Sequence, residues 1–372
     1  MKWSWRIGRI AGIDVYIHAT FPLLFVWIAL SGLGGGATVR TIAWTLALTL
    51  AVFAIVVLHE CGHALTARRF GIQTRDITLL PIGGIARLER MPREPRQELL
   101  IGLAGPAVNV LLAALLYGVL RLRGVTAVLP ELERSATAVT VTSALAQLTA
   151  INIWLAAFNL IPAFPMDGGR VLRAILAARL GDYAKATASA ARVGRAFALL
   201  FALVGIFWLE SPMLALIALF VWIAATSEAM AVRTAALLEH VPLASVMITD
   251  FRTLAPNDTL RRAAELTIEG FQQDFPVTDR DALIGMLTRR DLLRGLAEHG
   301  GAATVAEAMR REFPTASVDD RADSALERLS TARGSALPVL RGAQLVGVLT
   351  AENVSEFLSL QAAIEGRDRS PR

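Results

Sequence analysis

Residues 41–63 read TIAWTLALTLAVFAIVVLHECGH, in which 18 uncharged residues from Thr41 to Leu58 run directly into two histidines and a glutamate. About 20 predominantly apolar residues are enough for a helix to cross the hydrocarbon core of a membrane. Ionisable side chains are costly at membrane depth, so their presence at the end of such a helix indicates a function. The segment therefore predicts a membrane-spanning helix with a functional site near its end.

The charged end of this segment has the spacing of a metal site. His59 and His63 are four residues apart, so on a helix both imidazoles lie on one face and can bind one ion. Glu60 lies beside them and is placed to take a proton from a water molecule that attacks a carbonyl carbon. The alternative is that the span ends before His59 and that these three residues are ordinary interfacial side chains.

A third ligand is needed, because catalytic zinc sites commonly combine three protein ligands with an open position. The candidate is Asp167, in the segment NLIPAFPMDGGR at residues 159–170. Two prolines and two glycines break the helical pattern there, and irregular backbone at membrane depth is tolerated where it is buried in protein or lines a wet cavity. For Asp167 taken alone, a carboxylate that caps the following helix is the alternative.

Apolar segments of spanning length recur along the first two thirds of the chain, and we predict six membrane-spanning helices. They lie at about residues 15–39, 41–59, 99–120, 141–162, 193–209 and 211–231. The loops on the side of the N-terminus carry 15 Lys and Arg residues, against four in the loops on the other side. The positive-inside rule therefore predicts a multi-pass protein of the cytoplasmic membrane with both termini in the cytoplasm. In this topology His59, His63 and Asp167 lie at a similar depth.

Two short segments have the pattern of strands rather than of helices. Residues 76–89, DITLLPIGGIARLE, and residues 7–18, IGRIAGIDVYIH, are rich in β-formers and lack a helical period. An isolated strand pair is marginally stable, so the two segments are expected to pair with each other near the membrane surface. The fold class expected here is a polytopic α-helical membrane protein with a small membrane-associated β region.

The composition changes near residue 240. Residues 1–239 hold 21 Lys and Arg against 13 Asp and Glu, whereas residues 240–372 hold 16 against 19. The second part repeats one pattern of strands and helices, at about residues 243–299 and 303–360. A unit of this size has a weak core, so the two copies are expected to pack as one soluble α/β domain. Because the basic excess lies among the spans, we expect no nucleic-acid binding.

The motifs at residues 59–63 and 159–170 together resemble those of the site-2 protease family of intramembrane zinc metalloproteases. The segments PIGG at 81–84 and AGPAVN at 104–109 extend the resemblance, and the C-terminal repeat resembles the tandem CBS domains of one branch of this family. The resemblance implies one zinc ion per chain, with Glu60 as the catalytic acid and base. It implies these metal ligands: His59, His63 and Asp167. It implies these substrate-binding residues: Asn159, Asn109, Gly83 and Gly84.

Members of this family cleave peptide bonds inside transmembrane helices, commonly after another protease has shortened the substrate. The resemblance therefore implies a transmembrane protein as the substrate and partner, with membrane lipid around the enzyme. Helical peptide bonds are shielded by their own hydrogen bonds, so the substrate must unwind. An exposed strand edge at residues 82–88 is expected to hold it extended.

CBS pairs bind adenosine nucleotides in clefts between their halves, so the resemblance implies ATP, ADP or AMP as a regulatory ligand. The segment that contacts ribose and phosphate corresponds to GMLTRRD at residues 285–291, which contains Thr288 and Asp291. The second copy, GVLTAEN, contains Thr350 but has Asn353 in place of the aspartate. The alternative is that both threonines only cap helices and that no ligand binds. A homodimer formed through the CBS domains is a further expectation.

A CBS-gated ion transporter or channel is the main alternative from another class of protein, because paired CBS domains also regulate such proteins. No inverted repeat is visible among the six spans, and a glutamate flanked by two histidines is what hydrolysis needs. We therefore expect an intramembrane zinc metalloendopeptidase with a regulatory domain.

Overall fold

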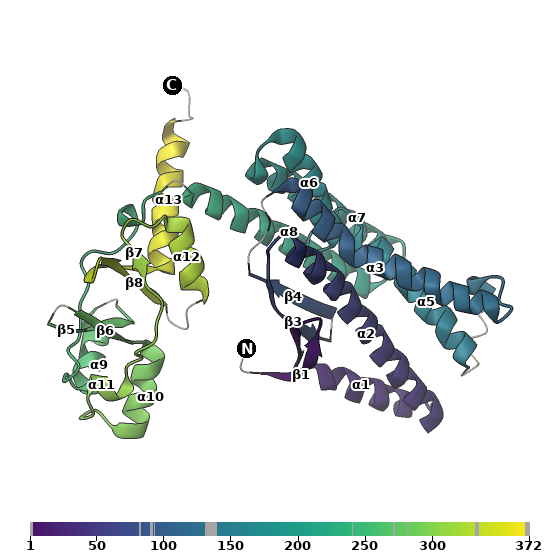
Figure 1. Ribbon diagram of the computed structural model, residues 1–372, viewed down its shortest axis with the longest axis horizontal. Coiled ribbons are helices and arrows are strands. Elements are labelled where there is room, and N and C mark those ends of the chain that lie inside the picture. The colour runs from purple at the N-terminus through teal and green to yellow at the C-terminus, as the bar shows by residue number, and fades with distance from the viewer. Residues whose placement is uncertain are drawn as a thin grey trace. The chain divides into compact units, whose positions relative to one another are not determined.

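The computed structural model describes residues 3–368, apart from residues 82, 90, 91, 93, 131–139, 240, 271, 281 and 332–334. The chain divides into two compact units, Met1–Met230 and Ala231–Arg372. Each unit has its own β-sheet (Figure 1).

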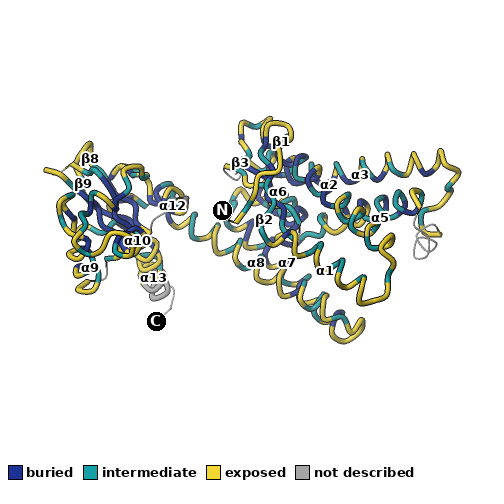
Figure 2. Tube along the Cα trace, turned by 90° about the horizontal axis from the view of Figure 1, so that it is seen from below, coloured by how far each residue is buried: buried dark blue, intermediate teal, exposed yellow. Residues whose placement is uncertain are grey.

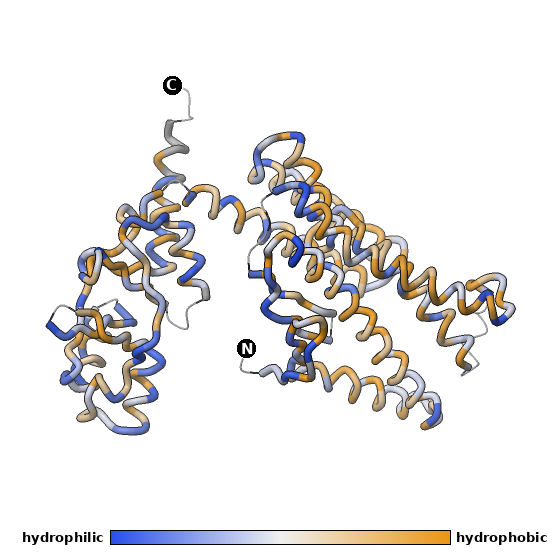
Figure 3. Tube along the Cα trace, in the orientation of Figure 1, coloured by the Kyte–Doolittle hydropathy of each residue, from blue (hydrophilic) through white to orange (hydrophobic). Residues whose placement is uncertain are grey.

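Long apolar helices form most of the first unit. They are α1 (Phe21–Gly34), α2 (Val39–Arg69), α3 (Pro95–Leu122), α5 (Val141–Asn159), α6 (Asp167–Leu180), α7 (Tyr183–Phe207) and α8 (Pro212–Leu238). Among the described residues, five helices are long and apolar enough to cross a membrane: α2, α3, α5, α7 and α8. Figure 3 shows the hydrophobic residues along them. These helices coincide with five of the six predicted spans.

The first predicted span, residues 15–39, is wrong at both of its ends. Val15 lies in a β-strand, where its branched side chain packs well, and the helix α1 begins only at Phe21. The helix ends at Gly34 and is followed by two further glycines. Its 14 residues reach about 21 Å, which is less than the roughly 30 Å of a hydrocarbon core.

Large apolar side chains remain exposed on the outside of the first unit. Trp154, Phe207 and Trp208 are 73%, 79% and 82% exposed. Exposed residues run along the outer sides of the helices in Figure 2. Contiguous apolar surface of this kind is rare on soluble monomers, and it fits a surface that faces lipid.

A four-stranded sheet packs on the second half of α2. Its strands are β1 (Ser4–Ile10), β2 (Ile13–His18), β3 (Thr74–Leu80) and β4 (Gly83–Leu88), in that spatial order. β2 and β3 pair in parallel, and the other two pairs are antiparallel, so the predicted pairing of residues 7–18 with 76–89 is confirmed. Val15 and Ile77 are buried against Phe53 and Val57 of α2, in the turns that precede the two histidines. The sheet therefore lies next to the predicted site.

The helix α3 packs against α2, α5 and α6 and so connects the two motifs. α5 ends at Asn159, the chain turns over residues 160–166, and α6 begins at Asp167. The break that the two prolines predicted is therefore present, and it brings the first turn of α6 against α3.

The second unit holds a five-stranded sheet of order β5-β6-β9-β8-β7. Its elements are η1 (Leu243–Ser245), α9 (Leu260–Glu269), β5 (Phe275–Asp279), β6 (Ala282–Leu287), α10 (Arg289–His299), α11 (Val305–Ala308), β7 (Ala316–Ser317), α12 (Ala322–Thr331), β8 (Ala336–Arg341), β9 (Gln344–Thr350) and α13 (Ala351–Asp368).

The two copies of the repeat exchange their first segments. Leu243, at the start of the first copy, is buried in a core with Leu337 and Val354 of the second copy. Val305, at the start of the second copy, is buried in a core with Phe275 of the first copy. Neither core is complete without the other copy, which explains why the two copies form one domain.

Candidate metal centre

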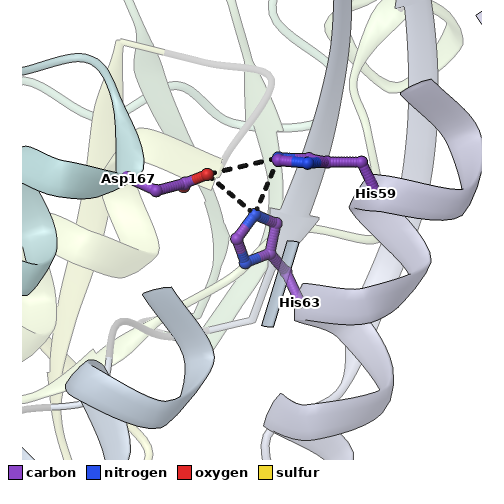
Figure 4. Close-up of side chains that lie close together, drawn as sticks. All are labelled: His59, His63 and Asp167. Atoms are coloured by element: carbon purple, nitrogen blue, oxygen red, sulfur yellow. Dashed lines mark hydrogen bonds and ion pairs between the residues drawn. The ribbon is translucent and has the colours of Figure 1, made fainter. Parts of the chain in front are cut away.

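Three buried side chains from α2 and α6 meet at one point in the first unit. Oδ2 of Asp167 lies 3.2 Å from Nε2 of His59 and 3.1 Å from Nε2 of His63. The two Nε2 atoms are 3.1 Å apart (Figure 4). The three residues are only 5–8% exposed. The structure therefore brings together the three residues that were predicted as ligands.

The distances among these atoms fit a zinc ion. Two ligands of a tetrahedral zinc, each about 2.0–2.1 Å from the metal, are roughly 3.3 Å apart. The three atoms are separated by 3.1–3.2 Å and come from two imidazoles and a carboxylate, which are preferred zinc ligands. Three protein ligands leave a fourth position open, as a catalytic site requires.

The ring orientation of both histidines is set by acceptors on α3. Nδ1 of His59 lies 3.0 Å from Oδ1 of Asn109, and Nδ1 of His63 lies 2.6 Å from the carbonyl oxygen of Ile101. Each Nδ1 donates its proton to an oxygen, so each Nε2 keeps a free lone pair directed at the other ligands. The partner of His63 is a backbone carbonyl, which no sequence motif could have indicated.

The absence of a side chain at Gly105 provides space for the two Nε2 atoms. A Cβ atom at this position would lie 2.2 Å from Nε2 of His63 and 2.6 Å from Nε2 of His59. Sequence reasoning included Gly105 in a motif without giving it a role. The available signal was a glycine directly before Pro106 inside a long helix, since such a glycine often marks a close approach.

Glu60 lies between the two histidines in sequence and next to the edge strand β4. It is half-buried on α2, and a Cβ atom at Gly84 would lie 3.0 Å from its Cγ. Gly83 begins β4, and the outer edge of β4 pairs with no other strand in the described part of the chain. Ile82, the first residue of the predicted strand edge, lies outside the described residues.

The two asparagines predicted to bind substrate occupy different places. Asn109 is fully buried, and its oxygen is used by His59. Asn159 is half-buried at the end of α5, on the segment that leads to Asp167. Asn109 therefore contacts one of the clustered histidines, whereas Asn159 lies closer to the surface.

In the second unit, Asp291 is held by an arginine from outside its own helix. Arg310 donates to both carboxylate oxygens, at 2.5 Å through Nε and 3.1 Å through Nη2. Thr288 donates to Oδ2 at 2.5 Å and caps α10 by accepting from the Asp291 amide. Burial raises the pKa of Asp291, but the hydrogen bonds from Arg310 and Thr288 and the positive charges of Arg310 and Arg294 together outweigh burial and hold this pKa below its ordinary value. A cavity of about 220 Å³ adjoins Asp291, with Arg294 and His299 among its lining residues.

The equivalent position in the second copy has no such ion pair. Asn353 donates from Nδ2 to the carbonyl oxygen of Val246, and its amide donates to the hydroxyl of Thr350. The repeats are offset by 62 residues, so Ile248 stands where the first copy would require an arginine like Arg310. The second copy therefore lacks the aspartate, and the first copy lacks an arginine that could pair with it.

Models of known protein families match residues in both units. The model of peptidase family M50 matches residues 47–201, and the CBS domain model matches residues 243–298 and 305–360. Zinc metalloprotease MJ0392 of Methanocaldococcus jannaschii is 29% identical to this chain over 97% of each protein. Putative zinc metalloprotease Rip3 of Mycobacterium tuberculosis is 31% identical over 95% of this chain and 92% of its own length.

A solved structure gives a further likeness. The site-2 protease from Methanocaldococcus jannaschii is 36% identical, covers 61% of this chain and 95% of its own, and superposes with a TM-score of 0.43. The sequence relationships favour the predicted protease over the alternative of an ion transporter or channel. Over nearly its whole length this chain belongs to the site-2 protease family, peptidase family M50, and it is a multi-pass membrane zinc metalloprotease with a C-terminal pair of CBS domains.

Proposed function

We propose that this protease hydrolyses peptide bonds within or near the transmembrane segments of other membrane proteins. The observation that carries the proposal is the buried cluster of His59, His63 and Asp167, whose ligand atoms lie within 3.2 Å of one another. The cluster includes two residues of an apolar helix long enough to span a membrane. A hydrolytic site at that depth is suited to substrates that are themselves within the membrane.

The three clustered residues would hold the zinc ion, and Glu60 would transfer the proton. Bound zinc supplies a Lewis acid that makes a water molecule nucleophilic near neutral pH. Glu60 then accepts a proton from the attacking water as the carbon–oxygen bond forms. It returns this proton to the amide nitrogen as the carbon–nitrogen bond breaks, so one water molecule is consumed for each peptide bond cleaved.

The edge of β4 would hold the substrate beside Glu60. An extended peptide can add to an exposed sheet edge through main-chain hydrogen bonds, and β4 is such an edge. Gly83 and Gly84 carry no side chains that would keep a peptide away from Glu60. We retain Asn159 as a candidate for contact with the substrate or with the developing oxyanion. For Asn109 we propose orientation of His59 instead, because its oxygen is already used.

We propose that α1, although short, crosses the membrane together with its flanking residues, so that six crossings place both termini in the cytoplasm. The loops on that side hold most of the basic residues. In this orientation water reaches the metal centre from the cytoplasm. The protease domain would comprise residues 1–239 and the regulatory domain residues 240–372. The substrate would commonly arrive after a first cut by another protease has shortened it.

We also propose that the CBS pair binds an adenine nucleotide and thereby alters proteolysis. Thr288 and Asp291 are the candidates for ribose and phosphate contacts in the first copy, and Thr350 and Asn353 in the second. The cavity beside Asp291 and the two basic residues bonded to it, Arg294 and Arg310, support the first copy as a site for a phosphorylated ligand. We further propose that two chains associate as a homodimer through their CBS pairs.

Membrane proteomes of cells that carry wild-type protein or Glu60→Ala test the proposed substrate class. A substrate should accumulate in its uncut form with the variant, and its apolar span should contain the site that the wild type cleaves. If only soluble or extramembrane segments differed between the two cell types, the proposed substrate class would be wrong.

A further inference from the structure

A fully buried arginine lies on the same helix as Asp167. The guanidinium of Arg173 on α6 donates to Oε1 of Glu98 through Nε at 2.8 Å and through Nη2 at 2.5 Å. Its Nη1 donates to Oε1 of Glu228 on α8 at 2.5 Å. The side chains of Arg173 and Glu98 are 0% and 4% exposed, so this ion pair is shielded from water.

The guanidinium also contacts two aromatic rings, one of which belongs to the segment before Asp167. Its central carbon lies 5.0 Å from the ring centre of Phe164 and 4.9 Å from that of Tyr183 on α7. Contacts of this kind between a cation and a ring are attractive, and more so when water is excluded. Phe164 precedes Asp167 by three residues and Arg173 follows it by six. The arginine therefore holds the chain on both sides of Asp167.

Glu98 lies on the same helix, α3, that orients both histidines. The carbonyl of Ile101 binds His63, Gly105 adjoins both Nε2 atoms, and Asn109 binds His59. Glu98, Gly105 and Asn109 are separated by seven and four residues, a spacing that places them on one face of a helix. The Arg173–Glu98 pair therefore links the helix of the third ligand to the helix that sets the other two.

The stability of the fold alone is a weak reason for such a pair. Removing two charges from water is costly, and replacing a buried ion pair by neutral side chains of similar volume is often neutral or stabilising. A guanidinium contributes a defined orientation, because its planar fork of N–H groups bonds a carboxylate at fixed angles. Here both donors of the fork, Nε and Nη2, bond the same oxygen of Glu98 and so join α6 to α3.

We infer that Arg173, through Glu98, is a positioning residue that holds Asp167 against His59 and His63 for metal binding. The inference rests on the proposed metal-binding role of these three residues. Arg173 itself does not touch the ligand atoms, so its effect acts through the placement of Asp167. Loss of a residue that supports a metal ligand typically lowers metal affinity by about 10-fold to 100-fold.

Two variants test the inference in the full chain. The double variant Arg173→Met with Glu98→Gln removes both charges of the pair while keeping side-chain length. Arg173→Lys keeps the charge but loses the fork and much of the ring contact. Zinc affinity is measured by competition with a chelator, the thermal midpoint is measured on the metal-free protein, and the coordination geometry is followed in the visible spectrum of the cobalt-substituted protein.

Two control variants remove comparable groups away from α3. Arg195→Met removes an arginine on α7 whose guanidinium lies 5.9 Å from the ring of Trp222, on a helix that carries no ligand. Glu228→Gln changes the other carboxylate partner of Arg173, which is 33% exposed and does not lie on α3. Both controls should keep zinc affinity within about threefold of the wild type, since losing a residue that supports a metal ligand lowers the affinity by about tenfold or more.

We expect zinc affinity to fall about tenfold or more in both test variants, with an altered cobalt spectrum and a metal-free midpoint close to that of the controls. If the double variant does not fold, the zinc affinity of Arg173→Lys relative to that of the two controls tests the positioning role. Wild-type zinc affinity and cobalt spectrum in a folded test variant would overturn the positioning role. A wild-type protein that binds no zinc would instead overturn the proposed metal centre itself, so the two failures are distinguishable.

Discussion

Oδ1 of Asn109 lies 3.0 Å from Nδ1 of His59, and both residues are buried where α3 crosses α2. The bond makes Nδ1 the protonated nitrogen of His59 and leaves Nε2 free for a metal. Such partners also fix the angle of the ring and increase the basicity of the ligand. Asn109 therefore orients a residue of the candidate metal centre, although it would not touch the metal itself.

Asn109→Ala should lower zinc affinity by about 10-fold to 100-fold, because His59 loses the acceptor that orients it. Asn109→Asp keeps an oxygen at this position and should recover most of the affinity. Chelator competition on the purified proteins measures both. Equal affinities for the wild type and the alanine variant would show that the contact does not support the ligand.

Gly105→Ala should abolish zinc binding, because the added methyl group would lie where the two Nε2 atoms are. Gly118→Ala is the matched control, since it lies on the same helix and a Cβ atom there would meet nothing within 4 Å. Metal content per chain, measured on both purified variants, makes the comparison. A Gly105→Ala protein that retains a full complement of zinc would contradict the geometry of the site.

The cluster of His59, His63 and Asp167 was predictable, because each of its two motifs is local in sequence and places ionisable groups where burying them is costly. A pair of histidines four residues apart at the end of an uncharged stretch, and an aspartate after a break with two prolines, both stand out against a membrane background. The strands at residues 7–18 and 76–89 were also predictable, since their β-formers lack a helical period. Both predictions need only the neighbouring residues in sequence.

The remaining parts of the site depend on packing between distant segments. The carbonyl of Ile101 has no side-chain signature, and the Arg173–Glu98 pair joins residues 75 positions apart. The first span was predicted too long because Val15 and Ile17 are apolar in a strand as well as in a helix, and hydropathy does not distinguish the two. The bonds of Asp291 to Arg310 were not predicted either, because they also join residues from different elements that come together only by packing.

Asp291→Ala should weaken adenine nucleotide binding by about tenfold or more, the equivalent of roughly 1.4 kcal/mol or greater, since a buried carboxylate makes stronger hydrogen bonds than a neutral group. Asn353→Ala should have a smaller effect, because Asn353 carries no charge and Ile248 occupies the position equivalent to Arg310. Calorimetric titration of the full chain with ATP, ADP and AMP measures the binding. Absence of heat with all three would leave the CBS pair as a docking or dimerisation surface.

Arg310→Met should destabilise the second unit in a way that depends on pH. Arg310 lowers the pKa of Asp291, so the ionised pair stabilises the fold at pH values above the ordinary aspartate pKa of about 3.9. This stabilisation is lost as the pH falls through the lower pKa of the folded protein. Scanning calorimetry at neutral and acidic pH should show a deficit in the thermal midpoint that shrinks below about pH 4. A deficit that is independent of pH would exclude the ion pair as its cause.

In the proposed mechanism, a zinc ion held by His59, His63 and Asp167 works with Glu60 to cut peptide bonds within the membrane. The most direct measurement compares wild type and Glu60→Gln in proteoliposomes that contain a model protein with one transmembrane helix. Zinc per chain and the position of the cut, determined by mass spectrometry, are measured on the same preparations. We expect about one zinc in both proteins, a cut within the apolar helix by the wild type, and no cut by the variant. Cleavage by Glu60→Gln at the wild-type rate, or loss of its zinc, would contradict the role of Glu60 as the proton acceptor.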